Sequence, residues 1–315
     1  AQHYHHFGGR SPINDQNRDF IAALRADFDA RGIDLPVYWG NRNSEPFLAD
    51  TLAAMRDDGV TRAAAFVTSA YSSYSGCRQY RENLADAVAE VDRAPQLDKL
   101  RHYFDHPGFV RANADALAEA WSRLPAEQRD GAVVAFVTHS IPTAMEDTAG
   151  PDGGAYTAQH RAAADAIVAD LRTRGIDVGE ADLVFCSRSG PPHVPWLEPD
   201  VNDYLTEAHD KGTPAVVLAP IGFVSDHMEV VFDLDTEAAE TAADLGLRLE
   251  RAGTAGTHPA FVSAVADLLL ERAAVERGQA PTRAAASPLG PSHDVCPAGC
   301  CRNLRQERPA LCGRD

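Results

Sequence analysis

Three carboxylates recur at a helical spacing just after a strongly apolar segment. Glu229, Asp233 and Glu237 are each four residues apart, so on an α-helix they share one ridge. Like charges at this spacing destabilise a helix by about 0.2–0.5 kcal/mol per pair. A cation held along the ridge would offset that repulsion. The alternative interpretation is a solvated face on an acidic protein.

The elements around this ridge can be read from the neighbouring residues. Residues 215–223 are apolar, which predicts a buried strand. Ser225 and Asp226 are good N-cap residues, so we expect a helix to begin there. The ridge would then start near the carboxyl end of a strand, where open α/β sheets bind ligands.

A second segment has the same organisation. Residues 132–138 are apolar, and His139 follows them at once. A neutral imidazole can accept a proton or bind a transition metal near pH 7. A single histidine is more often structural, but its position at a second strand end favours a site shared with the acidic ridge.

Strands and helices are predicted to alternate along the whole chain. Short buried strands are expected at residues 35–39, 63–68, 132–138, 182–186 and 214–218, with weaker candidates at 100–104 and 247–251. Helical patterns cover residues 46–56, 79–91, 109–123, 156–174 and 259–277. Helices of this length between strands are typical of βαβ units, so the sequence predicts an α/β fold with parallel sheets.

Composition narrows the class of protein. Of 315 residues, 44% are hydrophobic and 24% are charged, as in an ordinary globular enzyme. The formal net charge of −17 disfavours nucleic acid and anionic membranes as partners, because phosphates would be repelled. No apolar run reaches the roughly 20 residues of a membrane span, and no signal peptide is visible. We therefore expect a cytoplasmic protein without a transmembrane segment. We also expect it to act as a monomer.

Six motifs together resemble one enzyme family. T-H-S-I-P surrounds His139 and G-F-V-S-D-H-M-E leads to Glu229. The others are F-G-G-R-S-P-I-N, Y-W-G-N-R-N-S-E-P-F, T-S-A-Y-S-S-Y-S-G-C-R-Q-Y and S-R-S-G-P-P-H-V-P-W-L-E-P-D. Over nearly its whole length the chain resembles ferrochelatases, which insert ferrous iron into a porphyrin. Its cysteine content is most similar to the actinobacterial branch, whose members act on coproporphyrin III and carry a [2Fe-2S] cluster.

The resemblance implies two Rossmann-like (chelatase) domains with parallel sheets and a porphyrin cleft between them. The expected parts are a first domain over residues 1–125, a second over 126–257, a C-terminal helix packing back over 258–287 and a cysteine-rich cluster tail over 288–315. The chain begins after the family's opening strand, so we expect the first domain to lack that strand.

The resemblance also assigns the chemistry. It implies insertion of ferrous iron, as substrate, into coproporphyrin III to give coproheme in haem biosynthesis. His139 and Glu229 match the catalytic pair, and Asp233 and Glu237 would extend the metal path. Contacts to the porphyrin are expected from Ser11, Ser72, Tyr74, Tyr80 and Ser189. The alternatives are protoporphyrin IX as substrate, another metal such as cobalt, or a tetrapyrrole-binding or redox-sensing module without turnover.

The cysteines predict a second metal centre. Four of the six, Cys296, Cys300, Cys301 and Cys312, lie in a tail that follows a Pro- and Ala-rich stretch. Such a tail cannot order itself by burial, so its thiols are expected to hold a disulfide, zinc or an iron–sulfur cluster. The resemblance implies a [2Fe-2S] cluster bound by Cys77 and three tail cysteines. Adjacent thiolates rarely bind one cluster, so Cys300 and Cys301 are alternatives. Cys186, at a strand end, is expected to be a small core residue.

Overall fold

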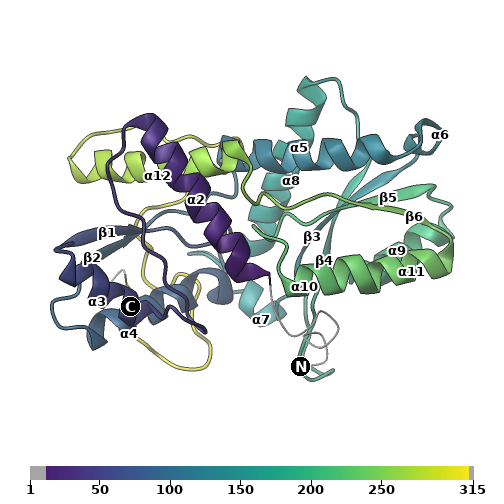
Figure 1. Cartoon of the computed structure of the whole chain (residues 1–315). Helices are drawn as coiled ribbons and strands as arrows, with labels where there is room; N and C mark the ends of the chain where they lie inside the picture. The colour runs from purple at the N-terminus through teal and green to yellow at the C-terminus, as the bar shows by residue number, and fades with distance from the viewer. Residues whose placement is uncertain (1–11, 312–315) are drawn as a thin grey trace.

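The computed structural model describes residues 12–311, which form two parallel sheets with helices around them (Figure 1). The smaller sheet pairs β1 (Arg62–Ala65) with β2 (Gln96–Lys99). The larger sheet has the order β4-β3-β5-β6. Its strands are β3 (Val133–His139), β4 (Ala181–Cys186), β5 (Ala215–Ala219) and β6 (Arg248–Arg251). The α/β class with parallel sheets is thus confirmed.

The helices lie between and around these strands. They are α2 (Ile13–Arg31), α3 (Leu48–Asp57), α4 (Gln79–Glu90), α5 (Pro107–Arg123), α6 (Ala126–Arg129), α7 (Thr143–Glu146), α8 (Ala155–Thr173), α9 (Val201–Asp210), α10 (Met228–Phe232), α11 (Ala239–Leu245) and α12 (Pro259–Glu276). Two π-helical segments, η1 (Tyr74–Arg78) and η2 (Asp233–Ala238), precede α4 and α11.

The side chains of strand β3 point alternately into two separate parts of the core. Val134 and Phe136 belong to the apolar cluster that includes α5 and α8, whereas Ala135 and Val137 belong to the cluster under α9–α11. Because side chains alternate along a strand, His139 shares the side of Ala135 and Val137. The strand therefore presents the histidine toward α10.

Helix α12 joins the two parts of the molecule. It packs against α5 and α2, and Figure 1 shows α12 and α5 running one after the other along one side of both sheets. At the α5–α12 contact, a Cβ on Gly108 would lie 2.2 Å from the backbone oxygen of Ala260, so only glycine permits this approach. The domain boundaries expected at residues 125/126 and 257/258 stay a prediction.

Three expected elements differ in the structure. The helix expected from Ser225 or Asp226 begins at Met228, with His227 as its N-cap. The Asp226 carboxylate binds Arg251 at 2.6 Å, and no side chain caps the helix. Residues 35–39 form no strand. The weak strand expected at residues 100–104 is replaced by β2, which ends at Lys99.

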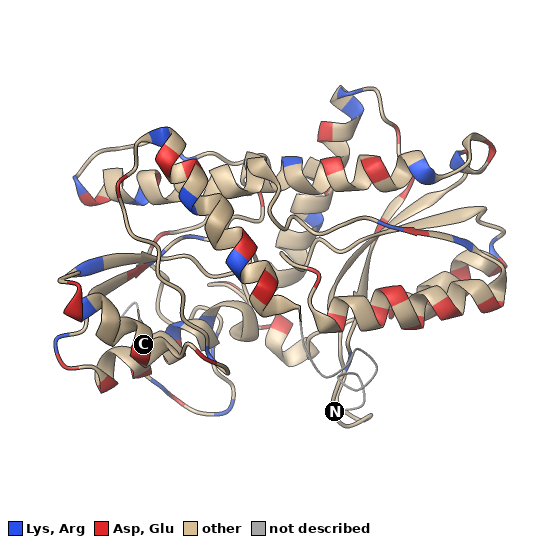
Figure 2. Cartoon of the chain, in the orientation of Figure 1, with Lys and Arg blue, Asp and Glu red and all other residues tan. Residues whose placement is uncertain are grey.

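The surface reflects the acidic composition. The chain has 46 Asp and Glu residues against 29 Lys and Arg, and Figure 2 shows acidic residues repeating along the helical run α10–α11. Among residues 12–311, no helix combines the length and the apolarity needed to cross a membrane.

Candidate functional site

The structure brings His139 and Glu229 together. His139 is the last residue of β3, and Glu229 lies in the first turn of α10, which follows β5. Strands β3 and β5 are neighbours in the sheet, so both side chains project from the same edge. The Nε2 atom of His139 lies 3.3 Å from Oε1 of Glu229. With side chains 35% and 47% exposed, the pair can meet a ligand from solvent.

The other ring nitrogen of His139 forms a hydrogen bond with the backbone. Nδ1 forms a short hydrogen bond with the backbone oxygen of Ser140; a carbonyl only accepts, so Nδ1 carries a hydrogen. The Tyr156 hydroxyl donates to the His139 backbone oxygen at 2.8 Å. The Thr138 hydroxyl in turn donates to the Tyr156 hydroxyl, also at 2.8 Å. In the neutral ring, the lone pair is thus on Nε2, facing Glu229.

Burial and charge act in opposite directions on this pair. Burial lowers the pKa of His139, but the hydrogen bond and charge of Glu229 outweigh it, so the pKa is raised from its usual 6.5. Burial likewise raises the pKa of Glu229, and the hydrogen bond and charge of His139 outweigh it, so that pKa is lowered. The pair therefore stabilises a proton on the histidine and a negative charge on the carboxylate.

Asp233 continues the site one turn further. It is 7% exposed and accepts a short hydrogen bond from the Ser187 hydroxyl. Burial raises its pKa, and the charge of Glu229 raises it further against the Ser187 hydrogen bond. Ser187 was not among the predicted site residues. Its backbone has φ +62°, an uncommon conformation for serine, and it directly follows Cys186 at the end of β4.

Glu237 lies at the far end of the acidic ridge. It is exposed, and Asp233 and Glu237 both belong to the π-helical segment η2 rather than to a regular α-helix. The three acids therefore run from a solvent-facing carboxylate at Glu237, through a buried one at Asp233, to the His139–Glu229 pair. Carboxylate oxygens in such a series suit a weakly held divalent cation.

A glycine sets how closely the loop after β5 approaches β3. The Gly222 amide donates to the Val137 oxygen at 3.1 Å. A Cβ at Gly222 would lie 2.1 Å from Oγ1 of Thr138, a distance no side chain tolerates. Because this contact is next to His139 in sequence, the glycine positions the loop that leads to Glu229.

The residues expected to contact a porphyrin are in different environments. Ser72 is buried, and its hydroxyl is engaged by Gln159 and His102, which favours a supporting role over direct contact. The Tyr74 hydroxyl donates to Glu82 at 3.2 Å. Tyr80 is half-buried beneath the guanidinium of Arg42, 4.4 Å from the ring centre. Ser189 is exposed beyond β4. Ser11 lies outside the described residues.

Four cysteines form one buried cluster: Cys77, Cys296, Cys300 and Cys301. Cys300 and Cys301, expected as alternatives, thus both belong to it, and the ligand set stays a prediction. None of the four is joined to another by a disulfide. Cys77 lies in η1, whereas the other three lie in the tail. The fifth expected ligand, Cys312, lies outside the described residues. Cys186 is buried under the larger sheet, so it is a core residue as expected.

The surroundings of the thiols suit an anionic, thiolate-bound centre. Hydrogen bonds from Cys296 and Cys301 lower the pKa of Cys77, and the charges of Lys99 and His102 lower it further. Hydrogen bonds from Cys296 and Cys301 also lower the pKa of Cys300, whereas the contacts with Cys300 and Cys77 raise the pKa of Cys301. The Nε2 atom of His102 is buried without a hydrogen-bond partner among residues 12–311, at a cost of about 1–3 kcal/mol.

Zinc is the alternative occupant of this cluster. The ligand atoms of His293, Cys296 and Cys300 lie within 4.8 Å of one another, and such nitrogen and sulfur donors suit tetrahedral zinc. A small cavity of about 10 Å³ adjoins them, lined in part by Lys99 and His102. The basic groups around it favour a centre of net negative charge.

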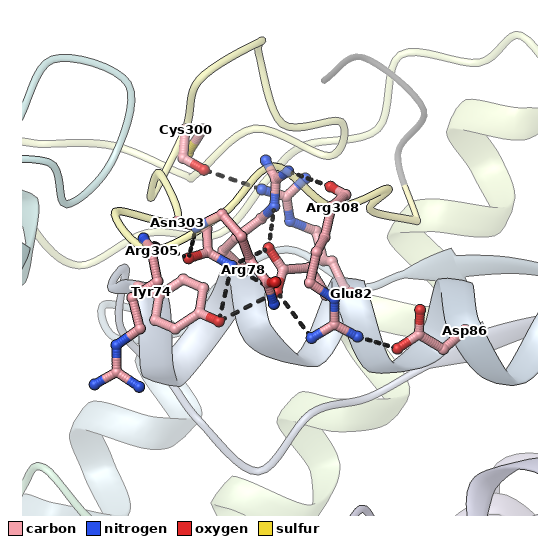
Figure 3. A network of polar contacts seen from close by, with 10 residues as sticks. Tyr74, Arg78, Glu82, Asp86, Cys300, Asn303, Arg305 and Arg308 are labelled. Atoms are coloured by element: carbon pink, nitrogen blue, oxygen red, sulfur yellow. Dashed lines mark hydrogen bonds and ion pairs between the residues drawn. The ribbon is translucent and has the colours of Figure 1, made fainter.

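A polar network anchors the tail beside the cluster (Figure 3). Glu82 of α4 is fully buried, and its carboxylate accepts from Arg78 at 3.2 Å and from Asn303 at 3.2 Å. Arg308 lies 3.6 Å from the same carboxylate. On the other side of the tail, the Cys301 amide donates to the Gly150 oxygen at 3.2 Å. The tail thus contacts both α4 and the loop between α7 and α8.

Comparisons with known proteins agree with this geometry. A family model described as Ferrochelatase matches residues 1–273. A coproporphyrin III ferrochelatase of Streptomyces coelicolor is 56% identical over 325 residues, covering 100% of this chain and 86% of the relative. A coproporphyrin III ferrochelatase of Nocardia farcinica is 50% identical over 318 residues, covering 100% of this chain and 88% of that relative.

Solved structures show the fold at a greater distance. SirB from Bacillus subtilis with Fe3+ superposes with a TM-score of 0.55 at 17% identity, covering 83% of this chain and 91% of SirB. The sirohydrochlorin chelatase SirB of Bacillus subtilis subspecies spizizenii, in complex with cobalt, gives a TM-score of 0.53 at 16% identity. The two-domain chelatase fold is thereby confirmed. The family model matches residues 1–273 of this chain, and relatives at 50% and 56% identity align with all of it, so the chain belongs to the ferrochelatase family.

Proposed function

We propose that this enzyme inserts ferrous iron into coproporphyrin III to give coproheme. The observation that carries the proposal is the His139–Glu229 pair, 3.3 Å apart at one edge of the larger sheet. The names of the similar relatives, coproporphyrin III ferrochelatases at 50% and 56% identity, support the choice of porphyrin.

His139 accepts protons in this reaction. Two pyrrole N–H protons must leave the macrocycle before iron can enter. In the neutral ring, Nδ1 donates to Ser140 and the Nε2 lone pair is exposed toward Glu229. Nε2 can therefore take a pyrrole proton, and the adjacent carboxylate stabilises the imidazolium that results. The backbone carbonyl of Ser140 keeps the ring in the required tautomer.

The acidic residues deliver the metal and remove protons. Glu237, Asp233 and Glu229 lead from the exposed end of η2 to His139. Hard oxygen ligands hold ferrous iron weakly enough to release it. Asp233, with its raised pKa, can pass a proton along the same path. Ser187 orients this carboxylate.

We also propose that the cysteine cluster holds a [2Fe-2S] centre, bound by Cys77 and three of Cys296, Cys300, Cys301 and Cys312. When bound, such a centre supplies a one-electron redox couple. The chain's own contribution is a buried set of thiols beside basic groups and a tail anchored by α4. Iron and acid-labile sulfide in anaerobically purified protein support this proposal, and one equivalent of zinc in a colourless protein contradicts it.

Anaerobic turnover tests the proposed reaction. Ferrous iron is supplied with coproporphyrin III or with protoporphyrin IX, and we expect a higher kcat/KM for coproporphyrin III. Faster turnover with protoporphyrin IX overturns the substrate assignment. Porphyrin binding without insertion of iron into either macrocycle indicates a binding module instead.

Variants of the pair test the mechanism. We expect His139→Ala to abolish insertion while porphyrin binding persists, and Glu229→Gln to lower turnover by at least about tenfold. Asp233→Asn and Glu237→Gln should have smaller effects, because they act further along the path. Full activity of His139→Ala contradicts the assignment.

A further inference from the structure

A chain of hydrogen bonds leads from helix α8 through Ser72 to His102, which lies beside the cysteine cluster. The Ser72 amide donates to Oε1 of Gln159 at 2.7 Å. A backbone N–H only donates, so this contact identifies the amide oxygen of Gln159. Its other atom, Nε2, lies 2.9 Å from Oγ of Ser72 and must donate to it.

This chain determines the tautomer of a buried histidine. Because the Ser72 hydroxyl accepts from Gln159 and contacts no other acceptor among residues 12–311, its own hydrogen is directed to Nδ1 of His102, 2.9 Å away. Nδ1 is therefore the acceptor, and Nε2 carries the hydrogen of the neutral ring. The donor that results is aimed away from Ser72.

That donor has no acceptor within the part of the chain that the structure describes. His102 is 5% exposed, and its Nε2 finds no hydrogen-bond partner among residues 12–311. The residue lines the small cavity that Cys296 also lines. Burial lowers the pKa of His102 and the charge of Cys77 opposes that shift, so Cys77 lies nearby, although its sulfur does not meet the geometry of a hydrogen bond to Nε2. The cysteine cluster beside this cavity supplies sulfur atoms that can accept this hydrogen.

We propose that His102 is a positioning residue that donates its Nε2–H to a sulfur atom of the iron–sulfur cluster. The inference rests on the cluster proposed above and adds a specific non-ligand contact to it. The same chain links the cluster to Gln159, which shares α8 with Tyr156, the residue that holds the His139 backbone. Ser72 and Gln159 thus connect the cysteine cluster to the catalytic edge of the sheet.

The contact has a redox consequence. Hydrogen bonds to cluster sulfur are among the factors that set the potential of iron–sulfur centres. Reduction adds negative charge to the cluster, which strengthens an N–H···S bond. Loss of the donor should disfavour the reduced state about tenfold, which lowers the potential of a one-electron couple by about 59 mV.

A pair of variants separates the two ends of the imidazole. In His102→Gln, the side-chain amide reaches the position of Nε2 and can still donate to sulfur. In His102→Asn, the shorter amide reaches only the position of Nδ1 and keeps the Ser72 contact. We expect the potential, measured by dithionite titration with mediators, to fall in His102→Asn and to stay near the wild-type value in His102→Gln. Equal potentials in all three proteins overturn the proposal.

A measurement on the wild-type protein tests the same contact even if the variants fail to assemble the cluster. Protein labelled with 15N-histidine is reduced and examined by pulsed EPR. Because Nε2 of His293 lies 3.9 Å from Sγ of Cys300, the measurement is repeated on His293→Gln. A weak 15N coupling that persists in this variant supports the contact from His102; no coupling, the strong coupling of a metal-bound histidine, or a coupling that disappears in His293→Gln overturns it. Wild-type protein without iron and sulfide overturns both the cluster and the contact, whereas an intact cluster without the coupling overturns only the contact.

Discussion

At the residue scale, the His139–Glu229 pair is tuned by two opposing effects. Removing an imidazolium from water costs free energy, so burial alone would keep His139 neutral. Glu229 and, less strongly, Asp233 reverse this and raise its pKa. The ring therefore takes up a proton more readily than a free histidine, which suits a group that collects protons from a macrocycle.

This balance predicts the pH dependence of catalysis. Below its pKa, His139 is protonated and cannot accept a pyrrole proton, so kcat/KM should rise with pH along a limb centred above the usual 6.5. In Glu229→Gln, the charge that raises the pKa is lost and burial remains, so the limb should move to lower pH. Steady-state kinetics from pH 5 to about 9 measure the shift, because kcat/KM reports the free enzyme. A limb that does not move contradicts the role of Glu229 in setting the pKa.

The sequence predicted the members of this pair better than their surroundings. The strand that leads to His139 and the apolar run before Glu229 could both be read from the pattern of hydrophobic residues. Ser187 could not, because its contact with Asp233 depends on a left-handed backbone at the end of β4. Ser72 was expected at a ligand surface, but its burial follows from the packing of α8 against its loop, which no local pattern encodes.

At the element scale, both candidate sites use π-helical turns. Cys77 lies in η1, and Asp233 and Glu237 lie in η2. A π-turn adds a residue to the helical repeat and often occurs at functional sites. Residue patterns assume the regular α-helical repeat, so the sequence predicted a regular helix over the acidic ridge and began the other helix at residue 79, after η1. The strand expected at residues 35–39 was wrong for a related reason: a strand needs a partner, and none is described there.

The close approach of the loop after β5 to β3 gives a second prediction. Gly222→Ala would place a Cβ 2.1 Å from Oγ1 of Thr138, so the loop must shift. We expect a loss of about 1–3 kcal/mol in the free energy of unfolding and reduced turnover, because the loop leads to Glu229. Urea unfolding and iron insertion measure the two effects.

Gly253→Ala is the matched control for this substitution. A Cβ at Gly253 meets nothing within 4 Å, and its φ is not positive. Stability and activity should therefore stay close to those of the wild-type protein. If the two alanine variants are equally stable, the fit of Gly222 against Thr138 does not constrain the loop.

At the scale of the whole molecule, the tail is attached through a buried carboxylate. Glu82 accepts from Arg78 of η1 and from Asn303 of the tail (Figure 3). Glu82→Gln keeps the shape but leaves the charges of Arg78 and Arg308 without their central partner. We expect a loss of about 3–5 kcal/mol, measured by denaturant unfolding, and faster tryptic cleavage of the tail.

A neighbouring ion pair provides the comparison. Asp86 binds the same Arg308 but is 43% exposed, and exposed pairs contribute about 0–1 kcal/mol. Asp86→Asn should therefore change stability and tail cleavage only slightly. Equal effects of Glu82→Gln and Asp86→Asn would show that the tail is not held by the buried carboxylate.

The cysteine cluster should hold the tail more strongly than these polar contacts. Cys77 and Cys296 are 219 residues apart in sequence yet share one buried cluster, and binding energy at a shared metal centre becomes folding energy. We expect Cys77→Ser to remove the visible absorption of the protein and lower its stability. Cys186→Ser is the control, because Cys186 is equally buried, at 1% exposure, but lies in the core under the larger sheet. Absorption spectra, iron content and thermal unfolding of the two variants decide the matter. Bleaching by Cys186→Ser, or a coloured Cys77→Ser protein, would remove Cys77 from the proposed ligand set.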